Sequence, residues 1–290
     1  MGQKIKKELA QDDGAELWAT SLHPEINALA GNYHYHTLDI TMPSMVEEFM
    51  QRVRPHVLIN AAAQANVNRC EKEKAECQQV NTEAVRTLTR LANQHKTHLI
   101  QISTDFVFQG QQSICQEDDP RRPVNHYGLA KKQAEDHVME EASHWSIVRT
   151  ILVYGYVPAL NRNNLVTWVY QSLQKGKPIK VVSDQYRMPT LAEDLAGAIV
   201  QLARKEKEGI YHLSGRESMS IEQMAQRVAE YFNLDTSLIT PVTSAELDEP
   251  ARRPAHSGFN LFKAEKDLDY LPHSFEEGLE VVEQQMNKFH

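Results

Sequence analysis

Residues 99–108 read LIQISTDFVF, an apolar run that ends in two hydroxyl groups and a carboxylate. Residues 57–63, VLINAAA, are apolar in the same continuous way. Strands without polar alternation are typical of a parallel sheet covered by helices on both faces, so we expect both runs to lie centrally in such a sheet. Ligands of these sheets bind beyond the carboxyl ends of the strands, which makes the polar residues that follow each run the first candidates for a site.

Segments with strand-like and helix-like patterns alternate on either side of these runs. The expected strands are 16–22, 35–38, 56–62, 98–108, 146–153, 179–182 and 209–213. The expected helices are 44–52, 82–94, 127–141, 166–174, 192–204 and 221–232, preceded by a short amphipathic helix that starts at the first residue and is ended by Asp13 and Gly14. This alternation predicts an α/β protein with a doubly wound parallel sheet. Polar and proline-rich stretches beyond residue 155, such as NRNN (161–164) and EPARRPAHSG (249–258), predict a smaller second lobe.

Composition disfavours several classes of protein. The chain has 290 residues and a net charge of -8, so we do not expect nucleic acid as a partner. No apolar run approaches the roughly 20 residues of a membrane span or forms a signal peptide, and we expect a cytoplasmic protein. Three cysteines without CxxC spacing (Cys70, Cys77 and Cys115) indicate reduced structural thiols. We expect His34 and His36 to be half-buried strand residues, and we expect no metal site.

Tyr127 and Lys131 are four residues apart at the start of an expected helix, so their side chains share one face. A neighbouring lysine cation favours a phenolate, and we therefore expect Lys131 to lower the pKa of Tyr127. Ser103, Thr104 and Asp105 follow the most apolar strand at the edge where a carbonyl substrate would bind. Each motif alone is equally typical of an exposed helix face or an ordinary strand-to-loop transition, but their combination indicates an active site.

Five segments, in this order, carry a resemblance to a known family: STDFVF (103–108), YGLAK (127–131), RTILVYG (149–155), DQYRMPTLAEDLA (184–196) and ARRPAHSGFN (251–260). The chain resembles the extended short-chain dehydrogenase/reductases, and among them most of all the dTDP-4-dehydrorhamnose reductases. The resemblance implies a dinucleotide-binding Rossmann domain made of residues 1–153 with 189–215, and a substrate-binding lobe made of 154–188 and 216–290. It also implies NADP(H) or NAD(H) as the cofactor and reduction of the 4-keto group of a nucleotide-linked 6-deoxy sugar.

The resemblance implies a role for individual residues as well. Tyr127 would donate a proton to the carbonyl oxygen, Lys131 would hold the nicotinamide ribose and tune Tyr127, and Thr104 would hydrogen-bond the same oxygen. The residues implied in binding the cofactor, besides Tyr127 and Lys131, are Gly2, Asp39, Ile40, Asn60, Ala61, Ala62 and Ser103. Those implied in binding the substrate are Asp105, which would contact the sugar, Asn164, and Arg253, which would meet the pyrophosphate.

Several positions depart from the family's pattern. Asp105 is followed by Phe106 and not by a glutamate, which disfavours a dehydratase. Leu152 and Leu165 stand where aromatic residues are usual in the rhamnose reductases, so we expect a different sugar pocket. TSLHPE (20–25) carries no clear signal for NAD or for NADP. The regulatory beta subunits of methionine adenosyltransferase are similar in three of the five segments, so a dinucleotide-binding regulatory subunit without turnover is the alternative. A homodimer is left open.

The first residues are also unusual for this family, which begins with a strand and a glycine-rich GxxGxxG turn. MGQKI (1–5) matches only the end of that turn, with Gly2 at its third glycine. We therefore expect the family's first strand to be absent from the sheet, the dinucleotide site to be weakened, and the neighbouring strand edges to be unpaired. A start assigned at an internal methionine is the expected cause, and a true truncation is the alternative.

Overall fold

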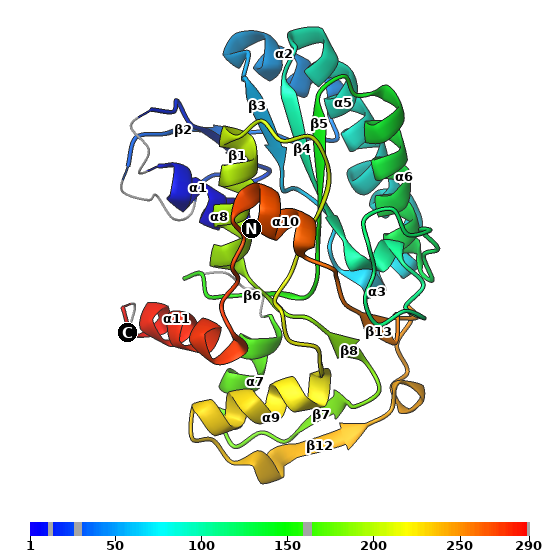
Figure 1. Cartoon of the computed structure of the whole chain (residues 1–290), viewed down its shortest axis with the longest axis vertical. Coiled ribbons are helices and arrows are strands. Elements are labelled where there is room, and N and C mark those ends of the chain that lie inside the picture. The colour runs from blue at the N-terminus through cyan, green and yellow to red at the C-terminus, as the bar shows by residue number, and fades with distance from the viewer. Residues whose placement is uncertain (11–13, 26–30, 159–163, 289–290) are drawn as a thin grey trace.

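The computed structural model describes residues 1–10, 14–25, 31–158 and 164–288 (Figure 1). Its centre is a four-stranded parallel sheet with the strand order β10-β5-β4-β3. These strands are β3 (Val57–Asn60), β4 (His98–Thr104), β5 (Trp145–Thr150) and β10 (Gly209–Leu213). The α/β class with a parallel sheet, expected from the alternation of the segments, is confirmed.

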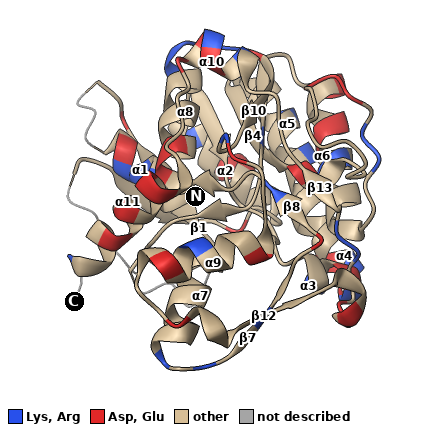
Figure 2. Ribbon diagram, turned by 60° about the horizontal axis from the view of Figure 1, so that its bottom comes forward, with Lys and Arg blue, Asp and Glu red and all other residues tan. Residues whose placement is uncertain are grey.

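Helices cover both faces of this sheet (Figure 1). Leu99 and Ile147 face α5 (Ala84–His95) and α6 (His126–Glu141), whose apolar residues form one cluster with them. Ile100 and Val148 point the opposite way, into a cluster with α1 (Gly2–Leu9), α8 (Ala192–Arg204) and α10 (Phe262–Leu268). Neighbouring residues of a strand face opposite sides, so one apolar run fills both layers. On the outer faces of α1, α9 and α10, acidic and basic residues alternate (Figure 2).

The two apolar runs take different places in the sheet. β4 is central and almost entirely buried, as expected. β3 lies at an edge, and Val57, Leu58 and Ile59 are only half-buried, so the prediction of a central position for 57–63 is wrong. The physical reason is that β3 has a neighbour on one side only; within the described ranges no strand pairs with its outer edge.

The N-terminal region forms a separate sheet. β1 (Trp18–Ser21) and β2 (His34–Thr37) pair in parallel with each other alone, and α2 (Pro43–Val53) follows. In the part of the chain that the structure describes, β1 and β3 therefore each keep one unpaired edge, as expected. His36 is half-buried, but His34 is exposed and stacks on Trp18, so the expected burial of His34 is wrong. The expected end of the first helix at Asp13 lies outside the described residues.

The C-terminal part has its own apolar cluster, which includes Val169, Ile179, Val228 and Leu279. In Figure 1 it forms the lower part of the molecule. Its helices are α7 (Leu165–Gln174), α9 (Ile221–Tyr231) and α11 (Phe275–Asn287). Its short strands are β6 (Val153–Tyr154), β7 (Ile179–Val182), β8 (Tyr186–Arg187), β9 (Thr190–Leu191), β11 (Met219–Ser220), β12 (Ile239–Val242) and β13 (His256–Ser257).

All expected strands and helices are present: β7, β10 and α8 have the expected bounds, and the bounds of the others are shifted. The strand expected at 98–108 stops at Thr104, where a 3₁₀ turn (Asp105–Val107) begins, and the one expected at 146–153 is divided into β5 and β6. The short strands β8, β9, β11, β12 and β13 and the helices α3 (Val67–Lys72), α4 (Lys74–Gln78), α10 and α11 were not expected. The three cysteines are free and buried, as expected. No helix of the described ranges is both long and apolar enough to cross a bilayer.

Candidate active site

Thr104 is the last residue of β4, and it organises the turn that follows. Its hydroxyl accepts a hydrogen bond from the Phe106 amide at 3.2 Å and donates one to Asp105 Oδ1 at 3.0 Å. Asp105 and Thr104 are both buried. The chain therefore leaves the sheet with a hydroxyl and a carboxyl held side by side at the carboxyl edge, where ligands of such sheets bind.

Tyr127 lies in the first turn of α6, directly above this turn. Asn125 caps the helix by accepting a hydrogen bond from the Gly128 amide at 2.8 Å. A Cβ at Gly128 would lie 2.1 Å from the Phe106 carbonyl oxygen, so only glycine lets α6 approach the β4 turn this closely. The Tyr127 ring packs edge-on against Phe106, with ring centres 5.7 Å apart.

The protonation of Tyr127 differs from our expectation. Burial raises its pKa above the ordinary value, the neighbouring Asp105 raises it further, and a hydrogen bond with Thr104 opposes the shift. The prediction that Lys131 lowers this pKa is wrong in this structure. The Lys131 ammonium instead donates a hydrogen bond to the Ile102 carbonyl at 2.6 Å, and burial lowers its own pKa to about 8. Desolvation outweighs the opposing hydrogen bond of Thr104 at Tyr127 and the opposing charge of Glu135 at Lys131.

Asp105 faces an arginine that sequence reasoning missed. Arg187 Nε lies 4.0 Å from Asp105 Oδ2, and both side chains are buried. Burial raises the pKa of Asp105, while Arg187, Ser257 and Thr104 oppose that shift. Arg187 belongs to DQYRMPT, one of the segments that carry the family resemblance, and this was the available signal.

Arg253 lies in the loop before β13 and is half-buried. It forms an ion pair with Glu249. Burial lowers its pKa, and the neighbouring charge of Arg187 lowers it further. The structure thus brings Arg253 close to Arg187 and, through Arg187, to Asp105.

The residues expected after β3 lie at the same edge as Thr104, because Asn60 is in register with Gln101 of β4. Asn60 Nδ2 donates to Gln101 Oε1 at 2.8 Å, and Asn60 Oδ1 accepts from the Ala62 amide at 3.2 Å. Ala61 is half-buried and Ala62 is exposed. These small side chains leave the backbone accessible beyond the end of β3.

Ser103 is turned away from Thr104 by the alternation of the strand. Its hydroxyl donates to Glu135 Oε1 at 2.5 Å. Glu135 is fully buried and accepts hydrogen bonds from Arg149 Nη2 at 2.8 Å and from Arg121 Nη1 at 3.1 Å. This network beneath α6 was missed as well, although Arg149 within the apolar run SIVRTI was a signal for it.

The remaining expected cofactor residues lie in the N-terminal region. Gly2 is in the first turn of α1, and a Cβ built there would meet nothing within 4 Å. Asp39 accepts hydrogen bonds from the Thr41 amide at 2.9 Å and the Thr41 hydroxyl at 2.7 Å, and Ile40 is half-buried. The buried ammonium of Lys131 is suited to hydrogen-bonding the ribose hydroxyls of a dinucleotide, whereas nothing among the described residues near Gly2 requires a glycine there.

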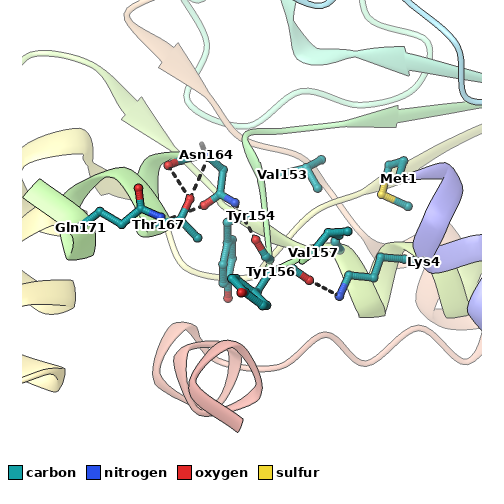
Figure 3. Close-up of a pocket in the computed structure, with 11 residues that line it drawn as sticks. Met1, Lys4, Val153, Tyr154, Tyr156, Val157, Asn164, Thr167 and Gln171 are labelled. Atoms are coloured by element: carbon teal, nitrogen blue, oxygen red, sulfur yellow. Dashed lines mark hydrogen bonds between the residues drawn. The ribbon is translucent and has the colours of Figure 1, made fainter. Parts of the chain in front are cut away.

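A cavity of about 150 Å³ lies between the start of α1, the segment after β6 and α7 (Figure 3). Asn164 lines it, but its side chain is engaged: Nδ2 donates to the Gly155 carbonyl at 2.6 Å, and Oδ1 accepts from the Thr167 amide as the cap of α7. Lys4 Nζ donates to the Tyr156 carbonyl at 2.6 Å. The lining includes none of Thr104, Tyr127 and Lys131, so the structure does not bring Asn164 together with them. No group of three or more potential metal ligands was found in the described ranges.

The parallel sheet, the threonine at the end of β4 and the tyrosine–lysine pair at the start of α6 define a protein of the extended short-chain dehydrogenase/reductase type. Within this class, a family model described as the RmlD substrate binding domain matches residues 1–288. The chain belongs to this family.

The similar proteins include reductases and subunits of methionine adenosyltransferase 2. A dTDP-4-dehydrorhamnose reductase of Aggregatibacter actinomycetemcomitans is 30% identical over 261 residues, which cover 84% of this chain and 86% of that protein. The methionine adenosyltransferase 2 subunit beta of Pongo abelii is 29% identical over 279 residues, which cover 91% of this chain and 78% of that protein.

Similar solved structures include reductases as well. A dTDP-4-dehydrorhamnose reductase of Clostridium acetobutylicum has a TM-score of 0.85 and 25% identity and covers 99% of this chain and 95% of that one. One of Bacillus anthracis, in complex with NADP, has a TM-score of 0.83 and 29% identity and covers 93% of this chain and all of the other.

Proposed function

We propose that the protein reduces the 4-keto group of a nucleotide-linked 6-deoxy sugar with NADPH or NADH, in the manner of the dTDP-4-dehydrorhamnose reductases. The observation that carries the proposal is the cluster of Thr104, Tyr127 and Lys131 at the carboxyl edge of β4, with two of these groups shifted in pKa by burial. Clusters of buried titratable groups at such an edge are typical of catalytic sites. The names of the similar reductases supply the substrate class.

The roles of the residues follow from their chemistry. When bound, a reduced nicotinamide would supply the hydride to the carbonyl carbon. Tyr127, whose raised pKa keeps the phenol protonated at neutral pH, holds the proton at Oη and donates it to the carbonyl oxygen as negative charge develops. Thr104 hydrogen-bonds the same oxygen, and Lys131 moves its ammonium from the Ile102 carbonyl to the nicotinamide ribose.

We infer that the binding of the cofactor and the binding of the substrate are divided between two lobes. Residues 1–153 and 189–215 bind the dinucleotide through Gly2, Asp39, Ile40 and the segment 60–62, while residues 154–188 and 216–290 bind the sugar nucleotide through Asn164 and Arg253. Separate apolar clusters around β4 and around α9 support a division into two lobes, but Phe259, Ala264 and Leu268, from the stretch 216–290, pack in the first cluster. A complex of the Bacillus anthracis reductase with NADP supports that cofactor. We propose a cytoplasmic protein and leave the homodimer open.

The second candidate is a regulatory subunit without turnover. The beta subunit of Pongo abelii matches nearly as well as the reductases do, and this is the observation in its favour. Such a protein would bind the dinucleotide but would need no proton donor.

The decisive experiment is a screen of nucleotide-linked 4-keto sugars, with dTDP-4-keto-6-deoxyglucose first, against NADPH and NADH. We expect oxidation of one reduced nicotinamide that depends on the keto sugar. Cofactor binding without turnover, together with a stoichiometric enzyme recovered by pull-down from the native host, would support the regulatory candidate and contradict the reductase. Light scattering on the same sample tests the homodimer.

A further inference from the structure

Cys70 and Cys77 lie together beside the candidate active site. Cys70 belongs to α3 and Cys77 to α4, two short helices that meet at Glu73. Both thiols accept a hydrogen bond from one amide group: Asn81 Nδ2 donates to Cys77 Sγ at 3.3 Å and to Cys70 Sγ at 3.8 Å. Both side chains share an apolar cluster with Tyr127. The fold thus places two thiols next to the proposed proton donor.

The two cysteines are also what anchors α3 and α4 in the core. Of the residues in these two helices, which the structure describes in full, only Cys70 and Cys77 are buried. On the outside, Arg69 pairs with Glu73 and with Glu76, and these ion pairs are exposed to solvent. Exposed ion pairs contribute little to stability, so we expect this segment to open locally more readily than β4 and to admit small solutes to the thiols.

The two thiols differ in acidity. A hydrogen bond between them is the largest cause of the pKa shift in both: it lowers the pKa of Cys77 and raises that of Cys70. Burial raises both values, while Asn81 and the charge of Lys131 lower the pKa of Cys77. Because the thiolate is the nucleophile of thiol chemistry, Cys77 is suited to attack an oxidant and Cys70 to resolve the product.

We propose that Cys70 and Cys77 are a modification site at which a peroxide forms a reversible disulfide. The Cys77 thiolate attacks one peroxide oxygen, the O–O bond breaks, and the departing hydroxide takes up the proton that Cys77 has lost. Cys70 then attacks the sulfur of the sulfenic acid, the S–O bond breaks, and the hydroxyl leaves with the Cys70 proton as a second water. Two thiols lose two electrons, and one peroxide is reduced to two waters.

The disulfide would act on the start of α6. Glu71 Oε2 of α3 accepts a hydrogen bond from the His126 amide at 2.9 Å, and His126 Nε2 donates to the Lys74 carbonyl of α4 at 3.2 Å. His126 directly precedes Tyr127. A disulfide draws its sulfurs to about 2.0 Å, so α3 and α4 must shift, and His126 shifts with them. We therefore expect the bond to lower turnover; this consequence rests on the proposed function, whereas the bond itself does not.

The first experiment detects the bond in the full-length chain. The reduced wild type is treated with hydrogen peroxide, its remaining thiols are alkylated in denaturant, and trypsin separates the two cysteines by cleaving after Lys72 and Lys74. We expect one alkylated thiol, that of Cys115, and a linked pair of peptides that dithiothreitol separates. Three alkylated thiols, a bond that includes Cys115, or oxidation that dithiothreitol does not reverse overturns the proposal.

Three variants assign the roles of the thiols. Cys115→Ala is the matched control, because Cys115 is buried in a different apolar cluster, and it should form the same linked peptides. Cys77→Ala should keep both remaining thiols after peroxide treatment. Cys70→Ala should instead accumulate a sulfenic acid at Cys77, which dimedone labels. A dimedone adduct at Cys70 in Cys77→Ala, with none at Cys77 in Cys70→Ala, overturns the assignment of the attacking thiol.

Turnover tests the consequence for activity. We expect peroxide to lower kcat for the keto sugar by about 10- to 100-fold in the wild type and in Cys115→Ala, and dithiothreitol to restore it, because a small displacement of a reacting group is costly. Cys77→Ala should lose less than about twofold. Equal turnover of the oxidised and reduced wild type overturns the effect on activity. If the reduced wild type shows no turnover but the linked peptides form, the proposed reductase function fails and the disulfide site stands.

Discussion

The four-stranded sheet and the N-terminal pair of strands differ in how deeply their residues are buried. All but one of the seven residues of β4 are buried, whereas none of the residues of β1 or β2 is. Thr104, Tyr127 and Lys131 belong to the first region, and Asp39 and Ile40 to the second. The groups proposed for proton chemistry are therefore fixed by dense packing. The groups proposed for the far end of the dinucleotide instead follow a two-stranded sheet without a buried residue.

The two regions also differ in how deeply their charged groups are buried. Beneath α6, Glu135 is fully buried and paired with Arg149, which leaves no water to solvate either group. In the N-terminal region, Trp18 Nε1 donates to the exposed Glu16 carboxylate at 2.9 Å, and the Trp18 ring stacks on the exposed His34 at 4.4 Å between ring centres. Buried pairs cost much when one partner is removed, but surface contacts cost little. We therefore expect substitutions of buried groups around the four-stranded sheet to have larger effects than substitutions in the N-terminal pair of strands.

The largest effect should come from Tyr127→Phe. Loss of the proposed proton donor should lower kcat by about 100- to 10,000-fold, while the affinity for the reduced nicotinamide, followed by its fluorescence, stays near that of the wild type. Steady-state assays with the keto sugar found in the screen measure the change. Tyr231→Phe is the control, because its hydroxyl bonds Glu283 in the C-terminal part. Turnover by Tyr127→Phe at the control's rate would show that the proton comes from elsewhere.

Breaking the network beneath α6 should have the next largest effect. In Glu135→Gln the buried Arg149 loses its counter-charge, and we expect the free energy of unfolding to fall by about 3–5 kcal/mol. Glu141→Gln on the same helix is the matched control: its pair with Arg86 is half-exposed, so about 1 kcal/mol or less is expected. Urea unfolding measures both. Equal losses would mean that burial does not distinguish the two pairs.

Lys131 should make stability depend on alkaline pH. Its pKa in the folded state is about 8, below the ordinary 10.5 of a lysine. Below about pH 8 the ammonium is charged in both states, and its burial costs on the order of 3 kcal/mol. As the pH rises toward 10.5, the folded state loses the proton first and the cost disappears.

The measurement compares the wild type with Lys131→Met, so that all other titrating groups cancel. The wild type should gain free energy of unfolding relative to the variant between about pH 8 and about pH 10. A difference that stays flat over this range contradicts the lowered pKa.

The smallest effect should come from the N-terminal pair of strands. Trp18→Ala removes the stacking on His34 and the edge contact with Phe49, and we expect a loss of about 1 kcal/mol. Hydrogen exchange should show faster exchange of the β1 and β2 amides in the variant, with β4 unchanged. Faster exchange throughout β4 would mean that the two sheets unfold as one unit.

Local patterns in the sequence determined much of the fold and part of the candidate site. The apolar run of β4, the helical stripes of α5 and α8 and the alternation between them predict the sheet and its layers, because burial follows directly from the period of the apolar residues. Tyr127 and Lys131 are neighbours by helix geometry alone. The glycine after Tyr127 is visible in the sequence, but the reason for it is visible only in the structure. The Phe106 carbonyl leaves no room for a Cβ at Gly128.

Contacts between distant segments were decided only by the tertiary structure. The edge position of β3 depends on which strands find partners, and the facing of Arg187 and Asp105, 82 positions apart, depends on the path of the chain between them. The pKa of Tyr127 moved opposite to the prediction because desolvation depends on everything packed around the phenol. The sequence alone thus determined the residues that we propose for the chemistry and their local spacing. The tertiary structure decided their burial, charge partners and support, because these depend on all the segments that fold around them.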